Sequence, residues 1–175
     1  MASKTDLKGY TALVTGGSSG IGLEFCRTLA ARGADIVMVS IQEKELPEAC
    51  AMLRDNYGVK AYGLMLDLTR DDATQRIADF LDTESIEPDI LINNAGIFAF
   101  NTLLDIPERK IDCFIDLHVR AVTSLSLFFA RRMAARGRGY ILNMSSMSCW
   151  MPMPGIAMYS ATKAYIRVFT RALNY

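Results

Sequence analysis

Three side chains in the last third of the sequence have the chemistry of an acid–base site: Ser146, Tyr159 and Lys163. Tyr159 and Lys163 are four residues apart, which places them on one face of a helix. A tyrosine with an unperturbed pKa near ~10 is a poor acid–base catalyst at neutral pH, but a neighbouring lysine ammonium lowers that pKa. The Ser146 hydroxyl could hydrogen-bond a substrate carbonyl where charge develops. Together the three predict proton transfer at a carbonyl, although a Tyr-x-x-x-Lys pair or a turn serine alone is common by chance.

A second stretch, Thr15-Gly-Gly-Ser-Ser-Gly-Ile-Gly22, has the composition of a phosphate-binding turn. The apolar run 10–15 before it predicts a buried strand, and the helical spacing of apolar residues over 23–32 predicts a helix after it. The free N–H groups and the positive dipole of that helix would face an anion. Without a ligand, the same glycines would form only a tight strand-to-helix turn.

Each glycine of the turn has a separate expected purpose. Gly16 lets the backbone reverse, Gly20 removes a Cβ where a pyrophosphate would approach, and Gly22 lets the helix pack close to the strand. Ser18 and Ser19 can add hydroxyl donors to the phosphate.

The elements that must position these residues alternate regularly along the chain. Strands are predicted at 10–15, 34–40, 59–66, 89–93 and 140–144, and helices at 23–32, 42–56, 71–83, 107–136 and 158–175. The strands are continuously apolar, which is typical of strands covered on both faces. The sequence therefore predicts a single α/β domain over 1–175, a doubly wound parallel sheet of order 3-2-1-4-5 with a ligand crevice at the carboxyl ends of strands one and four.

Composition excludes several other classes of protein. Lys and Arg balance Asp and Glu at 19 each, which argues against a nucleic-acid binder or a polybasic membrane surface. No apolar run approaches the ~20 residues that span a bilayer, and the polar start lacks the core of a signal peptide. The four cysteines form no CxxC pair, and a single histidine offers no metal constellation. These features predict a cytoplasmic protein with reduced cysteines, no bound metal and no membrane span.

Taken together, the motifs resemble those of one family across essentially the whole chain. The glycine turn, Asn93-Asn-Ala-Gly96, Ser146 and Tyr159-Ser-Ala-Thr-Lys163 are similar to the classical short-chain dehydrogenases/reductases (SDR family) in order and spacing. The resemblance implies a Rossmann-like fold and an NAD or NADP cofactor. It implies that Tyr159 is the general acid–base, that Ser146 orients the carbonyl, and that Lys163 lowers the tyrosine pKa and holds the nicotinamide ribose.

The resemblance also implies where the rest of the cofactor lies. Asp67 is expected near the adenine and Asn93 near the adenosine ribose. The expected cofactor contacts, besides Tyr159 and Lys163, are Gly16, Ser18, Ser19, Gly20, Ile21, Gly22, Ser40, Asp67, Leu68, Asn93, Ala95 and Gly96.

Two features depart from the family pattern. His118, within Asp116-Leu-His-Val-Arg-Ala121, stands where the family usually has a catalytic asparagine that serves a water-mediated proton relay. An imidazole could serve that relay, could impair it by its bulk, or could be structural. The chain also stops inside an amphipathic helix, whereas family members usually run to about 250 residues. We therefore expect a truncated chain that lacks two strands and a substrate-covering loop, and that could be inactive.

Cofactor choice depends on the end of the second strand, Ser40-Ile41-Gln42. An acid there would bind the ribose hydroxyls of NAD and repel a 2′-phosphate. The stretch has no acid and no arginine, and Lys44 is the nearest positive charge, which favours NADP over NAD. The predicted function is an NAD(P)-dependent oxidoreductase acting on a carbonyl or secondary alcohol. The alternative is a non-catalytic nucleotide-binding or oligomerising relative, and an epimerase of the extended branch is disfavoured by the glycine spacing.

Apolar residues indicate the substrate and the assembly. Trp150, Met151, Met153 and Met158 make the segment after Ser146 apolar, which suits an apolar substrate but equally suits packing. The helices 107–136 and 158–175 carry apolar residues on more than one side, including Phe129 and Phe169, and must be buried twice. In the resembled family these helices pair across a two-fold axis, so we expect a homodimer or homotetramer.

Overall fold

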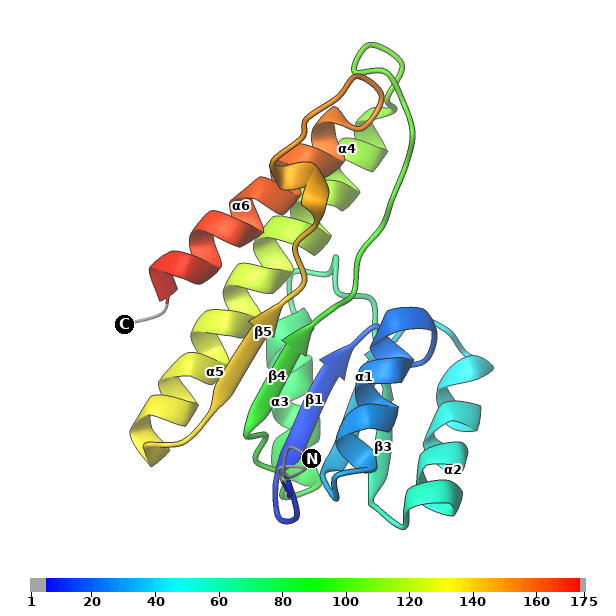
Figure 1. Ribbon diagram of the computed structural model, residues 1–175, viewed down its shortest axis with the longest axis vertical. Coiled ribbons are helices and arrows are strands. Elements are labelled where there is room, and N and C mark those ends of the chain that lie inside the picture. The colour runs from blue at the N-terminus through cyan, green and yellow to red at the C-terminus, as the bar shows by residue number, and fades with distance from the viewer. Residues whose placement is uncertain (1–5, 174–175) are drawn as a thin grey trace, which may run out of the picture.

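The computed structural model describes residues 6–173, which form a single five-stranded sheet with helices on both faces (Figure 1). All strand pairs are parallel, and the order is β3-β2-β1-β4-β5, which confirms the predicted topology. Each crossover contains a helix, as parallel pairing requires. The strands are β1 Thr11–Thr15, β2 Asp35–Ser40, β3 Ala61–Met65, β4 Ile90–Asn93 and β5 Tyr140–Asn143.

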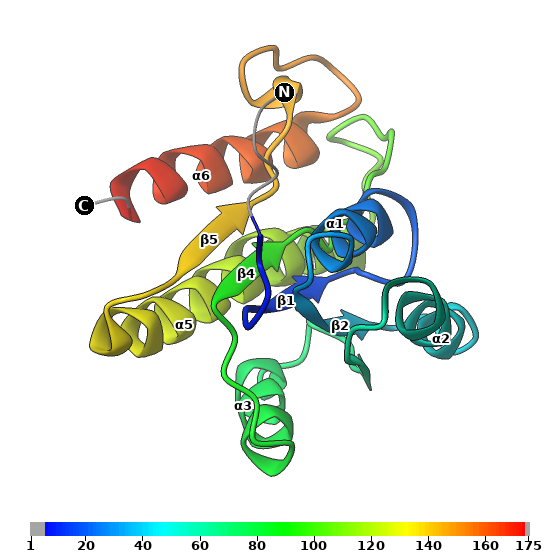
Figure 2. The ribbon, with the colours of Figure 1, turned by 60° about the horizontal axis from the view of Figure 1, so that its bottom comes forward.

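The helices form two layers, with α1 and α2 on one face of the sheet and α3 and α5 on the other (Figure 2). The last helix, α6, packs against α4 and β5. The predicted end of this helix at 174–175 lies outside the described residues. The helices are α1 Gly20–Ala30, α2 Glu45–Tyr57, α3 Ala73–Thr83, α4 Glu108–Ile115, α5 Val122–Arg136 and α6 Ala157–Leu173.

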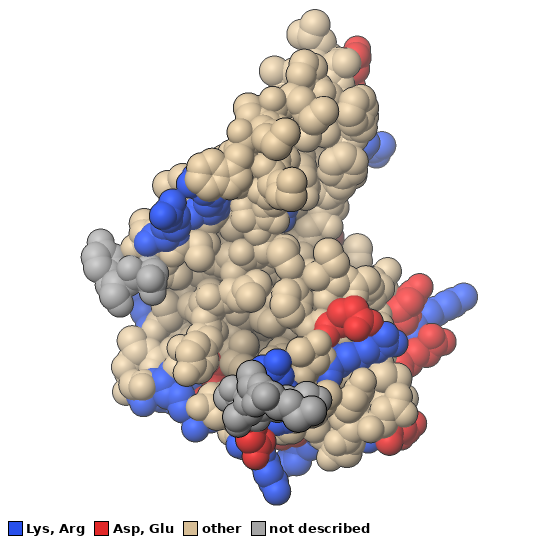
Figure 3. Space-filling model, viewed as in Figure 1, with Lys and Arg blue, Asp and Glu red and all other residues tan. Residues whose placement is uncertain are grey.

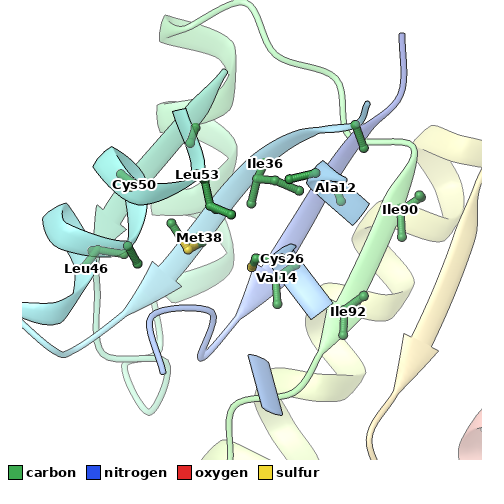
Figure 4. Packing of buried hydrophobic residues seen from close by; sticks show 14 residues of the cluster. Ala12, Val14, Cys26, Ile36, Met38, Leu46, Cys50, Leu53, Ile90 and Ile92 are labelled. Atoms are coloured by element: carbon green, nitrogen blue, oxygen red, sulfur yellow. The ribbon is translucent and has the colours of Figure 1, made fainter. Parts of the chain in front are cut away.

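The central strands are buried on both faces, as their unbroken apolar runs predicted. Side chains of a strand alternate between faces, so Ala12 and Val14 of β1 face α1 while Leu13 between them faces α3 and α5. Figure 4 shows the first of these cores, where Ile36 and Met38 of β2 lie beside the β1 side chains. Both cores bury aliphatic side chains completely, and this burial is the main stabilising contribution to the sheet.

The prediction that every strand is covered on both faces is wrong for the two edges. Along β3, only Ala61 is buried; after it, partly buried and exposed residues alternate, and Met65 is 59% exposed. On β5, Tyr140 is 63% and Leu142 is 40% exposed. An edge strand has a neighbour on one side only, so helices cover it less completely than they cover β1.

The segment predicted as one regular helix over 107–136 is a continuous helix with a π-helical segment in its middle. The π segment, Asp116–Ala121, joins α4 to α5 without a break. A π segment inserts one extra residue into a helical turn, and such insertions are frequent at functional sites. His118 lies within it. Nothing in the apolar spacing signals this insertion.

Within the described residues, Glu108–Arg136 is a helix long and apolar enough to cross a membrane by length and composition. The sequence-based expectation that no segment reaches this length therefore does not hold for this helix. Its apolar face, which includes Phe114, Leu125 and Phe129, is buried within the fold. The core helix of a globular domain meets the same length and composition test.

Gly22 allows a backbone contact that no other residue would tolerate. A Cβ on Gly22 would lie 2.0 Å from the carbonyl oxygen of Gly16, whereas a Cβ on Gly20 would meet nothing within 4 Å. We expect Gly22→Ala to lower the free energy of unfolding by about 3 kcal/mol in urea denaturation, because the clash is with backbone. Gly20→Ala is the control; its cost is about 1 kcal/mol, since φ is +53° there. Equal losses for the two variants would contradict this packing.

Candidate active site

A cleft of about 430 Å³ opens at the carboxyl ends of β1, β2 and β4, where the predicted topology placed a ligand crevice. Nine of the predicted cofactor contacts line it. They are Gly16, Ser19, Ile21, Gly22, Ser40, Asp67, Leu68, Ala95 and Gly96. Residues from four separate crossovers therefore meet in one place, as parallel strands require.

The glycine turn leaves an anion-binding helix end free at the cleft. Gly16 has φ of +64° and Gly20 has φ of +53°, conformations that glycine adopts without strain. Ser19 is the N-cap of α1, but its side chain makes no capping hydrogen bond. The first backbone N–H groups of α1 are therefore left for a ligand. The open space around Gly20 lies where a pyrophosphate would approach.

Ser18 does not face this cleft as the sequence suggested. Its side chain is buried, and its hydroxyl lies 2.7 Å from Ser40 Oγ and 2.6 Å from Gln42 Oε1, to which it donates. The Gln42 N–H donates in turn to Ser40 Oγ over 3.1 Å. These three contacts form a closed ring that uses the Ser18 hydroxyl within the protein. Ser18 thus supports the cleft wall, while Ser19 is exposed on it.

Gln42 is a cleft residue that the sequence reasoning did not include among the contacts. Because its Oε1 accepts from Ser18 within the ring, its amide NH₂ is directed away from the ring. Gln42 lines the cleft together with Ser40 and Ile41, the segment on which the sequence predicts that the choice between NAD and NADP depends. Its position two residues after β2 was the only signal in the sequence.

The two asparagines after β4 have different roles. The Asn93 side chain is buried on the α5 side of the sheet, where its amide donates to Ser126 Oγ and to Asn143 Oδ1. Asn94 instead lines the cleft, and its amide donates to the carbonyls of Thr15 (3.0 Å) and Gly16 (3.2 Å). Adjacent side chains of a strand point to opposite faces, so only one of the pair could reach the cleft.

The predicted catalytic pair lies where α6 meets the end of β5. Lys163 is 4% exposed, and its ammonium donates to the Met144 carbonyl over 2.8 Å. Its nitrogen lies 5.8 Å from the centroid of the Tyr159 ring. Burial lowers the pKa of Lys163 to about 8, because the apolar surroundings penalise the charge. A Cβ on Gly96 would lie 3.6 Å from this nitrogen, so the pair adjoins the cleft.

The Ser146 hydroxyl accepts two hydrogen bonds and can still donate its own proton. It is the N-cap of a short 3₁₀ helix, Met147–Cys149, and its oxygen accepts from Ser148 N (3.2 Å) and Ser148 Oγ (3.0 Å). A hydroxyl that accepts both of these bonds still has its O–H to donate. Its neighbour Ser145 donates to the Lys163 carbonyl over 2.7 Å, which ties the segment after β5 to α6.

His118 is completely buried between the cleft and α6. Its Nε2 accepts from the backbone N–H of Ile97 over 3.0 Å, and its Nδ1 lies 2.9 Å from Thr162 Oγ1. Burial, and secondarily the charge of Lys163, lowers its pKa to about 4. His118 and Tyr159 meet edge to face with 5.9 Å between ring centroids. The structure therefore brings His118 to the site but occupies both of its nitrogens.

Exposed apolar side chains gather at this end of the molecule, and one of them contacts Tyr159 directly. The Phe98 ring packs edge-on against the Tyr159 ring, with 5.1 Å between the centroids. Phe100 packs over Gly155 so closely that a Cβ on Gly155 would lie 2.6 Å from the Phe100 ring. The Arg167 guanidinium stacks on the Trp150 ring, with 3.2 Å between its central carbon and the ring centroid. Figure 3 shows that this end of the molecule, beyond the sheet, presents few charged atoms on the viewed face. Phe98 and Phe100 were not among the apolar residues noted in the sequence.

Comparisons with known proteins agree with this geometry. Residues 10–175 match the family model described as short chain dehydrogenase. The very-long-chain 3-oxoacyl-CoA reductase of Anas platyrhynchos is 32% identical over 171 residues, which cover 95% of this chain and 54% of that protein. This chain thus spans about half the length of the curated relatives that it matches first.

Two solved structures are similar over nearly the whole chain. L-sorbose reductase from Gluconobacter frateurii, complexed with NADPH and L-sorbose, has a TM-score of 0.92 and 30% identity, covering 98% of this chain and 65% of that one. A short-chain dehydrogenase from Sphingobium yanoikuyae in complex with NADPH has a TM-score of 0.88 and 34% identity, covering 94% and 65%. Strand order, motif positions and these similarities lead to one conclusion: the chain belongs to the short-chain dehydrogenase family.

Proposed function

We propose that the protein carrying this chain is an NADP-dependent oxidoreductase that interconverts a carbonyl and a secondary alcohol, with Tyr159 as general acid–base. The observation that carries the proposal is the position of Tyr159 and the buried Lys163, one helical turn apart beside the cleft wall at Gly96. The names of its relatives, which are reductases and dehydrogenases, support the same class of reaction.

The cleft fits a dinucleotide. The uncapped end of α1 and the open space at Gly20 suit a pyrophosphate, and the exposed Asp67 lines the cleft at the end of β3. The Gln42 amide offers donors to a 2′-phosphate and no negative charge to repel it. Two similar structures contain NADPH. Bound NADP would supply or accept the hydride.

The residues of the chain would donate the proton and stabilise the charge that remains. In the direction of reduction, Ser146 donates a hydrogen bond to the carbonyl oxygen and Tyr159 transfers its proton to that oxygen. The positive charge of Lys163 stabilises the phenolate that remains. Because Lys163 is held by Met144 and buried, its charge acts at short range and in a site of low dielectric constant.

The walls of the site favour an apolar substrate. Phe98, which packs against Tyr159, and Trp150 and Met151 of the segment after Ser146 are each more than 60% exposed. A bound hydrocarbon chain or ring would remove this apolar surface from water. One relative is named for very-long-chain 3-oxoacyl-CoA, whereas one similar structure holds L-sorbose, so the family admits both kinds of substrate.

A non-catalytic nucleotide-binding protein is the second candidate. The observation in its favour is that His118 stands where the family usually has a catalytic asparagine, and that both of its nitrogens are engaged by Ile97 and Thr162. Oxidation of NADPH with a panel of apolar ketones separates the two candidates. A cytoplasmic location stays a prediction of the sequence.

The first test removes only the proposed proton donor. Tyr159→Phe should lower kcat/KM for ketone reduction at least ~100-fold, the usual scale of acid–base catalysis, while NADPH still binds. The control is Tyr165→Phe, which removes a hydroxyl from the same helix that bonds Thr123 outside the cleft. Turnover that survives in the Tyr159 variant and falls in the control would rule the mechanism out.

The second test changes one group in the cleft wall. Gln42→Glu keeps an oxygen to accept from Ser18 but replaces the NH₂ donors by a negative charge beside the 2′-phosphate. We expect the Kd of NADPH to rise ~10-fold or more, since like charges a few ångströms apart repel by at least ~1 kcal/mol, and the Kd of NADH to stay or fall. Ser40→Asp should likewise shift the cofactor preference from NADPH towards NADH, but it also breaks the hydrogen-bonded ring of Ser18, Ser40 and Gln42. A wild-type preference for NADH would refute the proposal.

The third test concerns assembly, which we propose to be a homodimer or homotetramer formed through α5 and α6. The expectation from the sequence that Phe129 contributes to this interface is wrong, because Phe129 is 1% exposed and belongs to the core of the monomer. Val168 is 61% exposed on α6, beside the stacked rings of Tyr165 and Phe169. Val168→Asp should yield monomers in analytical sedimentation, while Val168→Ala keeps the assembly. A wild-type protein that is monomeric at micromolar concentration would exclude the interface.

A further inference from the structure

His118 connects three separate segments of the site. It lies in the π-helical segment, accepts from Ile97 in the segment after β4, and contacts Thr162 on α6. The Thr162 hydroxyl continues the connection, because it donates to the Tyr159 carbonyl over 3.0 Å. A line of hydrogen bonds therefore runs from the cleft wall through the imidazole to the residue proposed as the acid.

These contacts define the protonation state of the ring. A backbone N–H can only donate, so Nε2 must be the unprotonated nitrogen. The proton of the neutral ring is then on Nδ1, which donates to Thr162 Oγ1. Thr162 Oγ1 can accept this bond and still donate its own proton to the Tyr159 carbonyl. Every polar atom of this line is satisfied by the neutral Nδ1–H form, as buried polar groups require.

The same contacts leave the ring unable to carry a proton to or from Lys163. In the neutral ring, the lone pair of Nε2 accepts the hydrogen bond from the Ile97 N–H, and the Nδ1–H proton is donated to Thr162 Oγ1. The charged group that faces it, the Lys163 ammonium, disfavours a second positive charge. An imidazole that neither gives nor takes a proton can still hold its neighbours in place.

We propose that His118 is a positioning residue, a neutral Nδ1–H imidazole that holds the Ala95–Ile97 wall of the cofactor cleft against the catalytic helix α6. The inference rests on the proposed oxidoreductase function for its catalytic meaning, but the clamp itself is a property of the fold. A Cβ on Gly96 would lie 2.9 Å from His118 Nε2 and 3.6 Å from Lys163 Nζ. The imidazole thus sets the spacing between the backbone that lines the cleft and the two residues proposed to handle the proton.

The shape of imidazole suits this position better than an amide does. The amide of an asparagine reaches about as far as Nδ1 of a histidine, and the amide of a glutamine reaches about as far as Nε2. An asparagine at position 118 could therefore bond Thr162, and a glutamine could bond Ile97, but neither side chain could bond both. The imidazole of His118 bonds both partners at once.

The first measurement reads the protonation state directly in the wild-type protein. His118 is the single histidine of this sequence, and its ¹⁵N signals are identified as those that are lost in His118→Phe. We expect one protonated nitrogen at Nδ1 and one unprotonated nitrogen at Nε2, with no titration between pH 8 and pH 5.5. An Nε2–H form, or titration near the ordinary histidine pKa of about 6.5, would overturn the proposal.

The second measurement uses variants and separates binding from turnover. His118→Phe and Thr162→Val each break the clamp, and we expect the Kd of NADPH to rise about 10-fold in both, the effect of one lost buried hydrogen bond. His118→Gln, which can still bond Ile97, should recover most of this affinity. The effects of His118→Phe and Thr162→Val should be non-additive in the double variant, because they break one connection.

The pH profile distinguishes a clamp from a proton carrier. For a clamp, kcat/KM falls in the variants while the midpoints of its pH profile stay unchanged. If kcat falls, NADPH affinity is unchanged and one limb of the profile disappears, then His118 carries a proton and the proposal is wrong. The ¹⁵N spectrum and the NADPH titration need no turnover, so a protein that reduces no carbonyl would refute the proposed function without deciding the clamp.

Discussion

The close approach of Gly22 to the carbonyl of Gly16 is the contact on which the geometry of the cleft depends. It places the start of α1 directly over the end of β1, with no side chain between them. Asn94 then donates to the carbonyls of Thr15 and Gly16, so the segment after β4 is tied to the same turn. Because β1 and β4 are adjacent and parallel, these bonds fix the relative positions of the two segments that line the crevice at their carboxyl ends.

The other half of the site depends on a buried charge. The Lys163 ammonium is held by the Met144 carbonyl, and burial lowers its pKa because the surroundings solvate the charge less well than water does. Such a group is a poor source of stability, and strongly shifted pKa values are typical of functional sites. The bond from Ser145 to the Lys163 carbonyl brings the segment that carries Ser146 to the same turn of α6.

A partly buried network of polar side chains joins β4, β5, α5 and α6. Asn93 of β4 donates to Asn143 of β5, and Asn143 donates to Thr170 of α6 over 3.0 Å. Ser126 of α5 bonds both asparagines. Hydrogen bonds between side chains require defined geometry, so these bonds restrict how β4, β5, α5 and α6 can move relative to one another, although the buried Asn93 Oδ1 itself accepts no hydrogen bond. The edge of the sheet at β5 is therefore attached to both helices that flank it, although its outer residues are exposed.

The sequence by itself determined the strand order, the glycine turn and the positions of Ser146, Tyr159 and Lys163 along the chain. These follow from local patterns: unbroken apolar runs, glycine spacing and a four-residue separation on one helix. Only the tertiary structure decided that Ser18 bonds Gln42, that Asn94 and not Asn93 lines the cleft, and that Phe129 belongs to the core. It alone decided the π segment and the two partners of His118. The physical reason is that a spacing states which residues share a face, whereas a hydrogen-bond partner or a buried neighbour comes from a distant segment that packing brings close.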